Sequence, residues 1–132
     1  MKKIGKPVLT QTQWREKLSP KQYAVLREKA TEPAFSGEFD AFFKEGGYYC
    51  AACGAKLFSS KTKFDSGCGW PAFFDAQNNA VELKTDFSHG MTRVEAICSN
   101  CGGHLGHVFN DGPNPSGKRY CINSLALKFK EK

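Results

Sequence analysis

The sequence predicts a mainly β protein with helices at its N-terminal end, and three observations lead to this prediction. The chain has 132 residues, which is the size of one compact domain. Its first third carries helix start and stop signals. From Tyr48 onward, short β-prone runs alternate with glycine, asparagine, aspartate and proline. We therefore expect an N-terminal extension over residues 1–10 and a single domain over 11–132, with a helical part over 11–32 and a β body over 48–130.

The helical part is predicted to contain two helices. Ser19 is a good N-cap, Pro20 suits the first helical position, and Gln22 can complete a capping box. This helix should end near residues 31–33, because the residue before a proline is pushed out of helical geometry. A shorter helix over 12–18 should precede it.

The β body is predicted from seven short runs that contain β-branched and aromatic residues. Antiparallel strands with short connections are the natural result. The segment 33–47 before them is rich in phenylalanine and glycine and is expected to be mainly ordered loop. In the last run, Leu125, Leu127 and Phe129 should share one face. The predicted strands are GYYC (47–50), KLF (56–58), AVELKTDF (80–87), TRVEAIC (92–98), HVF (107–109), RYCI (119–122) and LALKFK (125–130).

The composition argues against several classes of protein. Hydrophobic residues make up 40% of the chain and charged residues 24%, which excludes a disordered tail. No apolar run approaches the roughly 20 residues of a membrane-spanning helix. The net charge is +6, but the lysines are scattered, so nucleic-acid binding is not expected. A polar stretch follows the first lysines where a signal peptide would be apolar, so we expect a cytoplasmic protein with reduced cysteines.

The strongest local signal is the pair of motifs CAACG (50–54) and CSNCG (98–102). Two such knuckles can supply four thiolates to one tetrahedral zinc ion, and the glycine after each allows a tight turn with positive φ. Four thiolates leave no open position, so this zinc would be structural. The alternatives are a thioredoxin-like redox motif or four unrelated buried cysteines. Because 44 residues separate Cys53 from Cys98, the site should join two distant segments of a larger sheet.

Two further cysteines, Cys121 and Cys68, lie outside these motifs. In a strand, Arg119, Cys121 and Asn123 would share one face, and a polar, positively charged setting favours a reactive thiolate over a buried structural thiol. Cys68 lies between two glycines, in a loop that would let it move toward a partner thiol. The two thiols suggest a catalytic and a resolving cysteine, although Cys68 can also be read as an incidental exposed thiol.

Three histidines and a tryptophan are further candidates for a site around the two redox thiols. His104 and His107 lie in the glycine-rich run GGHLGHVFNDGP, which we interpret as a loop, and either is a structural histidine, a partner of the zinc site or an acid near the thiol. His89 is expected to be an exposed loop residue. Trp70, close to Cys68, is either core packing or an aromatic wall for an apolar ligand.

The strings TEPAFSGEF, KFDSGCGWPAF, CSNCGGHLGHVFNDGP and RYCINSLALKF resemble the type B methionine sulfoxide reductases, which reduce the R epimer of methionine sulfoxide. The resemblance covers roughly residues 11–128. It implies two antiparallel sheets that form an open, barrel-like body, with the helices packed outside and zinc at one end. It also implies thioredoxin as reductant, repair of oxidised proteins, and peptide- or protein-bound methionine-R-sulfoxide as substrate. We expect a monomer without nucleic-acid or membrane partners.

The resemblance also implies roles for individual residues. The nucleophile would be Cys121, which becomes a sulfenic acid, and Cys68 would resolve it as a disulfide. His104 or His107 would donate a proton or orient water. An acidic residue is also implied, at Glu82, Asp86 or Glu95. The zinc ligands would be Cys50, Cys53, Cys98 and Cys101, and the substrate pocket would contain Trp70, Phe109, Arg119 and Asn123 in addition to the histidines.

Two other hypotheses account for the zinc motifs. A zinc-ribbon binding module would use the net charge of +6 but leaves Cys68 and Cys121 unexplained. A redox-switch chaperone would oxidise the zinc thiols themselves and release the metal. Counting reactive thiols with and without a chelator distinguishes these hypotheses from the reductase.

Overall fold

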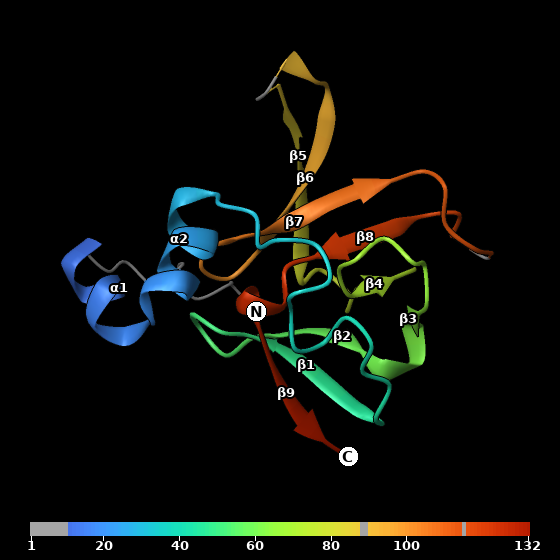
Figure 1. The fold of residues 1–132 in the computed structure, drawn as a ribbon, viewed down its shortest axis with the longest axis horizontal. Coiled ribbons are helices and arrows are strands. Elements are labelled where there is room, and N and C mark those ends of the chain that lie inside the picture. Colours follow the sequence, from blue (N-terminus) through green and yellow to red (C-terminus); the bar gives the residue numbers. More distant parts are fainter. Residues whose placement is uncertain (1–10, 88–89, 115) are drawn as a thin grey trace.

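The computed structural model describes residues 11–87, 90–114 and 116–132. Two antiparallel sheets form the body, and two helices pack beside them (Figure 1). The smaller sheet has the order β2-β1-β9, and the larger has the order β3-β4-β8-β7-β6-β5. The predicted fold class is therefore confirmed. The strands are β1 (Gly46–Cys50), β2 (Lys56–Ser59), β3 (Lys63–Phe64), β4 (Ala72–Phe73), β5 (Val81–Asp86), β6 (Arg93–Cys98), β7 (His104–Phe109), β8 (Arg119–Ile122) and β9 (Leu127–Glu131).

The two predicted helices are present as α1 (Gln11–Lys17) and α2 (Pro20–Glu28). The capping box that begins at Ser19 is formed as predicted. Helix α2 ends earlier than expected, because Lys29 adopts a left-handed conformation with φ 61°. The N–H of Ala30 then reaches back to the carbonyl of Ala24, which closes the helix before Pro33 can affect it. The predicted extension over 1–10 lies outside the described residues.

Two strand predictions need correction. The run 125–130 does not begin as a strand, because Ser124–Ala126 form a 3-10 turn and β9 starts at Leu127. The glycine-rich run around the histidines is not a loop, because β7 already begins at His104. Gly106 lies inside this strand, where a Cβ would collide with the carbonyl oxygen of Cys121. The glycine therefore allows β7 to lie close to β8, and it does not form a turn.

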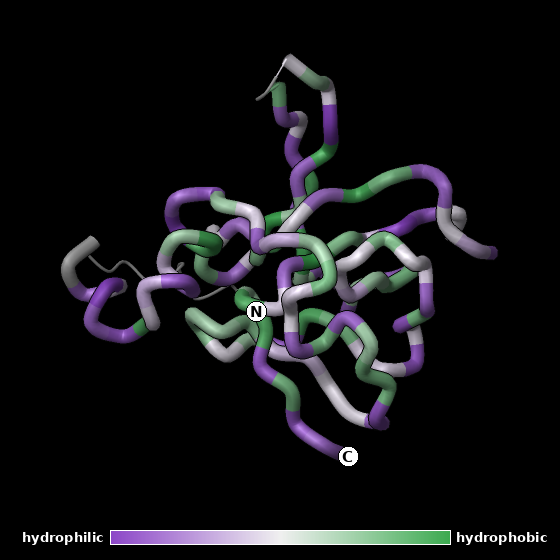
Figure 2. The backbone as a smooth tube through the Cα atoms, in the orientation of Figure 1, coloured by the Kyte–Doolittle hydropathy of each residue, from purple (hydrophilic) through white to green (hydrophobic). Residues whose placement is uncertain are grey.

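The core lies where the two sheets and the helices meet. Figure 2 shows hydrophobic stretches mainly in the middle of the molecule and many hydrophilic ones along the outer turns. Phe58 and Phe73 are fully buried and stacked with ring centroids 4.3 Å apart, and Tyr48 meets Phe73 edge-on at 5.1 Å. These rings pack β1 and β2 of one sheet against β4 of the other. The core thereby fixes the position of β4, which pairs with β8 in the larger sheet.

Candidate active site and metal centre

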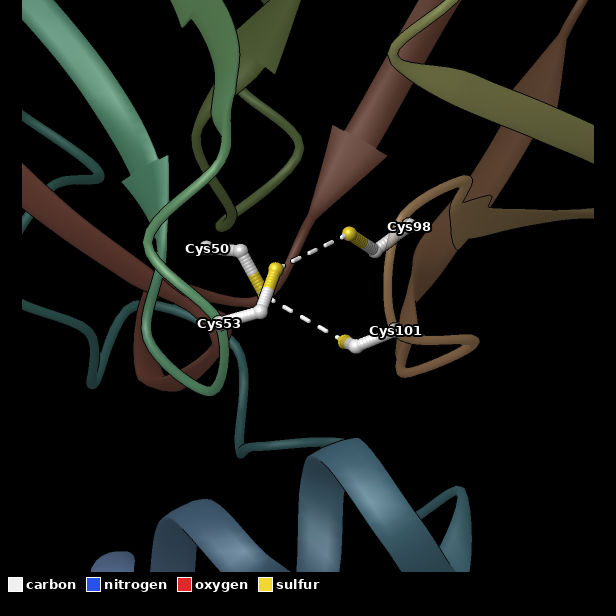
Figure 3. A group of neighbouring side chains, drawn as sticks. All are labelled: Cys50, Cys53, Cys98 and Cys101. Carbon is white, nitrogen blue, oxygen red and sulfur yellow. Dashed lines mark hydrogen bonds between the residues drawn. The ribbon is translucent and has the colours of Figure 1, made fainter. Parts of the chain in front are cut away.

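The four cysteines of the two knuckles form one cluster. Their sulfur atoms all lie within 4.8 Å of one another. Figure 3 shows the pair at the end of β1 facing the pair at the end of β6. The sulfurs of Cys50 and Cys101 lie 3.7 Å apart, and those of Cys53 and Cys98 lie 3.6 Å apart. Tetrahedral zinc with bonds of about 2.3 Å places its sulfurs about 3.8 Å apart, so this donor set fits zinc closely.

Each knuckle is a tight turn of the expected kind. Gly54 and Gly102 have φ values of 83° and 78°, and their N–H groups donate to the carbonyls of Cys50 and Cys98 at 2.8 Å. The prediction that the site joins parts of one larger sheet was wrong, because β1 and β6 belong to different sheets. A shared metal would therefore tie the two sheets together.

Helix α2 is attached to the same cluster. The guanidinium of Arg27 donates to the carbonyl of Cys101 at 3.1 Å and lies over the ring of Trp14 at 4.8 Å. The turn that carries Cys101 thus supports both N-terminal helices as well as the sheets.

Cys68 and Cys121 come together across the larger sheet. The short strands β3 and β4 form a hairpin whose loop carries Cys68, and Ala72 in β4 pairs directly with Cys121 in β8. This register brings the two sulfurs to 3.2 Å. Both cysteines are free thiols and both are partly exposed.

The two thiols perturb each other's ionisation. The hydrogen bond from the Cys121 thiol lowers the pKa of Cys68 to about 5. The same contact raises the pKa of Cys121, and burial raises it further, whereas the Arg119 guanidinium lowers it. The contact therefore favours loss of the first proton from Cys68, and the remaining thiol proton lies between the two sulfurs.

A pocket of about 300 Å³ opens at this pair of thiols. It is lined by both cysteines, by one histidine, by two aromatic residues and by several polar side chains. Such a mixed lining suits a small ligand that combines a polar group with an apolar one. The lining residues are Thr31, Cys68, Trp70, Arg93, Gly106, His107, Phe109, Arg119, Cys121 and Asn123.

Hydrogen bonds hold the pocket walls in place. Arg119 donates to both carboxylate oxygens of Asp111 at 2.9 and 3.1 Å and lies over the Phe109 ring at 4.5 Å. Contact with Asp111 raises the pKa of Arg119, which keeps its positive charge beside the thiols. The Trp70 indole N–H donates to a backbone carbonyl at 3.0 Å, and the Asn123 amide bonds the carbonyl of Leu105 at 2.9 Å.

The two predicted histidines occupy different places. His107 pairs directly with Cys121 across β7 and β8, and its Nε2 lies 2.8 Å from a carboxylate oxygen of Asp86. His104 lies deeper, with its Nδ1 2.7 Å from Glu95, and is absent from the pocket lining formed by the described residues. Burial lowers the pKa of His104. His89 falls outside the described residues.

The three acidic candidates differ in how deeply they are buried. Asp86 and Glu95 are about 5% exposed and bond the two histidines, whereas Glu82 is exposed on β5. Lys29 lies 3.8 Å from Asp86 and 3.2 Å from Glu95, so it neutralises part of this buried negative charge. The structure thus contains two neighbouring carboxylate–histidine pairs, whose histidine rings lie 5.4 Å apart. The pair of Asp86 and His107 reaches the pocket, and the pair of Glu95 and His104 lies deeper.

Comparison with known proteins assigns the chain to a family. The SelR domain matches residues 18–131. The chain belongs to this family, the type B methionine sulfoxide reductases. It is accordingly an oxidoreductase that reduces methionine sulfoxide, and the resemblance seen in its motifs is confirmed. Neither a zinc-ribbon binding module nor a redox-switch chaperone is supported.

The relatives of this reductase cover nearly all of its length. A peptide methionine sulfoxide reductase MsrB of Thiobacillus denitrificans is 60% identical over 93% of this chain and 94% of its own. One of Bradyrhizobium diazoefficiens is 58% identical over 96% of this chain and 92% of its own. A mouse protein named methionine-R-sulfoxide reductase B3, mitochondrial, is 56% identical over 97% of this chain and 51% of its own.

A more distant solved structure shares the fold alone. The Mis18 "Yippee-like" domain superposes with a TM-score of 0.55 at 18% identity, over 67% of this chain and 98% of that domain. Among the described residues of the reductase, no helix has the length and apolar character needed to span a membrane.

Sequence reasoning missed several residues at this site of the reductase. Arg93 lines the pocket and approaches Asp86 at 3.7 Å, but it lies outside the recognised motifs, at the start of β6 five residues before Cys98. Asp111 lies inside a recognised motif, two residues after Phe109, and its bond to Arg119 was predictable only from strand register. Thr31 reaches the pocket from the chain after α2, and although it begins the recognised string TEPAFSGEF, it was not assigned to the pocket.

Proposed function

We propose that this enzyme reduces the R epimer of methionine sulfoxide in peptides and proteins, with Cys121 as nucleophile and Cys68 as resolving thiol. The observation that carries the proposal is the 3.2 Å separation of the two sulfurs in one pocket. The R configuration is supported by the name of the mouse methionine-R-sulfoxide reductase B3, whose similarity to this chain covers 97% of it.

The first step consumes the substrate. The shared proton moves across the contact between the two sulfurs, which leaves Cys121 as the thiolate beside Arg119. This thiolate attacks the sulfoxide sulfur and the oxygen takes up a proton, because oxide is a very poor leaving group. The hydroxyl then passes from the substrate sulfur to the sulfur of Cys121, so that a new S–O bond forms on Cys121 while the substrate S–O bond and the transient S–S bond break. Methionine leaves, and Cys121 remains as a sulfenic acid.

The second step regenerates the thiols. Cys68 attacks the Cys121 sulfenic acid, water leaves, and the sulfurs close from 3.2 Å to a disulfide bond of about 2.05 Å. We propose that thioredoxin then reduces this disulfide by dithiol exchange. The glycines on both sides of Cys68 allow the small movement that this step needs.

His107 is the proposed proton donor to the departing oxygen. It lines the pocket beside Cys121, and Asp86 holds its ring by a 2.8 Å contact. His104 and Glu95 form the pair behind it, and we assign them a supporting role in keeping His107 and the carboxylate cluster in place.

The walls of the pocket account for substrate binding. Trp70 would hold the S-methyl group against its ring, a contact that sulfur and methyl groups favour. Phe109 extends the apolar wall, and Arg119 supplies positive charge near the sulfoxide oxygen. The Asn123 side chain, tied to Leu105, fixes the chain that follows Cys121.

The knuckle cysteines would hold one structural zinc ion, which stabilises the fold and takes no part in the redox steps. We also propose that residues 11–132 act as one reductase domain after an N-terminal extension, that the enzyme is a cytoplasmic monomer, and that it repairs oxidised proteins in stress responses. Neither nucleic acid nor a membrane is a proposed partner.

Turnover of separated epimers tests the function. The enzyme with a thioredoxin system should consume a peptide that contains methionine-R-sulfoxide and leave the S-sulfoxide peptide intact. The variant Cys121→Ser should be inactive, because a hydroxyl is far less nucleophilic than a thiolate. Reduction of the S epimer, or activity near the wild-type rate in Cys121→Ser, would contradict the proposal.

A further inference from the structure

The segment of residues 31–39, called here the strap, connects α2 toward β1 and touches both redox segments. The N–H of Phe35 donates to the carbonyl of Gly69, next to Cys68, at 2.7 Å. The N–H of Phe39 donates to the hydroxyl of Ser124, three residues after Cys121, at 3.1 Å. The strap therefore bridges the loop of the resolving thiol and the turn that follows the nucleophile.

Glu32 makes the largest set of these contacts. Its carbonyl accepts from the indole N–H of Trp70 at 3.0 Å, and its own N–H donates to the side chain of Asn123 at 3.0 Å. Its carboxylate oxygen Oε1 accepts from the N–H of Leu125 at 2.9 Å. Glu32 thus forms hydrogen bonds with Trp70 in the pocket wall and with two residues that follow Cys121 in the chain.

Of these three hydrogen bonds, only the one to Leu125 uses the side chain of Glu32, and the other two use its backbone. Glu32 is 4% exposed, and its second oxygen has no hydrogen-bond partner among the described residues. A buried polar atom without a partner reduces stability, so packing alone does not account for an acid here. Gly37 leaves room for it, since a Cβ there would collide with the carboxylate.

We propose that Glu32 is a positioning residue, whose carboxylate anchors the strap to the turn after Cys121 and thereby holds Trp70 in place for the substrate. The hydrogen bond between the carboxylate and Leu125 holds the Glu32 backbone in place. The carbonyl of that backbone in turn holds the Trp70 indole through its N–H. This inference rests on the proposed function of the Cys121 pocket. Because an acceptor oxygen is what the contact needs, a glutamine amide can replace the acid.

Kinetics and fluorescence of four proteins test this role. The variants Glu32→Ala, Glu32→Gln and Glu38→Ala are compared with the parent, all in a Trp14→Phe background that leaves Trp70 as the only tryptophan. Glu38 is an exposed acid of the same strap and serves as the matched control. The readouts are KM and kcat for a methionine-R-sulfoxide peptide and the emission maximum of Trp70.

Glu32→Ala should raise KM on the order of tenfold, with kcat changed less than about threefold, because a lost buried hydrogen bond loosens the binding wall rather than the thiols. Its Trp70 emission should shift to longer wavelength as the indole gains water. Glu32→Gln and Glu38→Ala should keep both the KM and the emission of the parent. If Glu32→Ala does not fold, Glu32→Asp, whose carboxylate is one methylene too short for Leu125, replaces it with the same expectation.

Several outcomes would overturn the inference. A parental KM and emission in Glu32→Ala would show that the strap needs no carboxylate, and an equal loss in Glu32→Gln would show that charge rather than an acceptor matters. An equal loss in Glu38→Ala would show a general property of the strap. If the parent itself reduces no methionine-R-sulfoxide, the proposed function fails instead, and the Trp70 emission still reports whether Glu32 positions the indole.

Discussion

The ionisation of Cys68 offers a direct test of the thiol pair. The hydrogen bond from Cys121 is the largest cause that lowers the pKa of Cys68 from 9.0 to about 5. The variant Cys121→Ala removes that bond and leaves burial, which raises the pKa, against weaker effects of Ser66, a backbone hydrogen bond of Trp70 and Arg119, which lower it. The midpoint for Cys68 ionisation should therefore move from near pH 5 to above about pH 8.

The assay is the rate of Cys68 alkylation by iodoacetamide between about pH 4 and 10, read by mass spectrometry of the peptide that contains Cys68. Below the midpoint the residue is an unreactive thiol, and above it a reactive thiolate. The midpoint, rather than the rate at one pH, is diagnostic. A thiolate of higher pKa is intrinsically more nucleophilic, with a Brønsted coefficient of about 0.4–0.5, so a smaller thiolate fraction can be offset at neutral pH.

A matched variant and a clear contrary result complete the test. Cys121→Ser keeps a hydroxyl that can donate to Cys68, so its midpoint should lie between those of the parent and Cys121→Ala. A midpoint that stays near pH 5 in Cys121→Ala would refute the reasoning, because the contact between the two sulfurs would then have no part in the acidity of Cys68.

Three further predictions concern recycling, the metal centre and the proton donor. Cys68→Ser should still form one methionine per enzyme in a single turnover, then stall with thioredoxin and recover in part with dithiothreitol. Full thioredoxin-dependent turnover would make Cys68 incidental. Cys53→Ser, or metal removal by a strong chelator, should lower the thermal midpoint by at least about 10 °C, because a four-sulfur site contributes folding energy. An unchanged midpoint would mean that the cluster carries no stabilising metal. Asp86→Asn should lower kcat about tenfold or more with a smaller effect on KM, because it disturbs the pair with His107. Glu82→Gln, an exposed control on the same strand, should behave as the parent, and an equal loss in both would argue against a specific role for Asp86.

Features that depend on neighbouring residues could be predicted from the sequence. The capping box at Ser19 and the left-handed glycines after each knuckle are properties of a few consecutive residues, and both are present. The spacing within each CxxC motif likewise brings its two sulfurs together through a local turn. These local rules, with the short alternating runs, were sufficient to predict the mainly β class and the cluster of four cysteines.

The arrangement of the active site depended on the tertiary structure. Cys68 meets Cys121 because β4, only two residues long, pairs with β8 in one register, and strands this short leave no periodic pattern to recognise. The two carboxylates at the histidines were distinguished from exposed Glu82 by burial, which follows from the packing of β5 and β6. His107, rather than His104, lines the pocket because the register of β7 and β8 pairs His107 with Cys121. Side-chain identity determined which chemistry was available to this protein, whereas non-local strand pairing decided which of those groups meet.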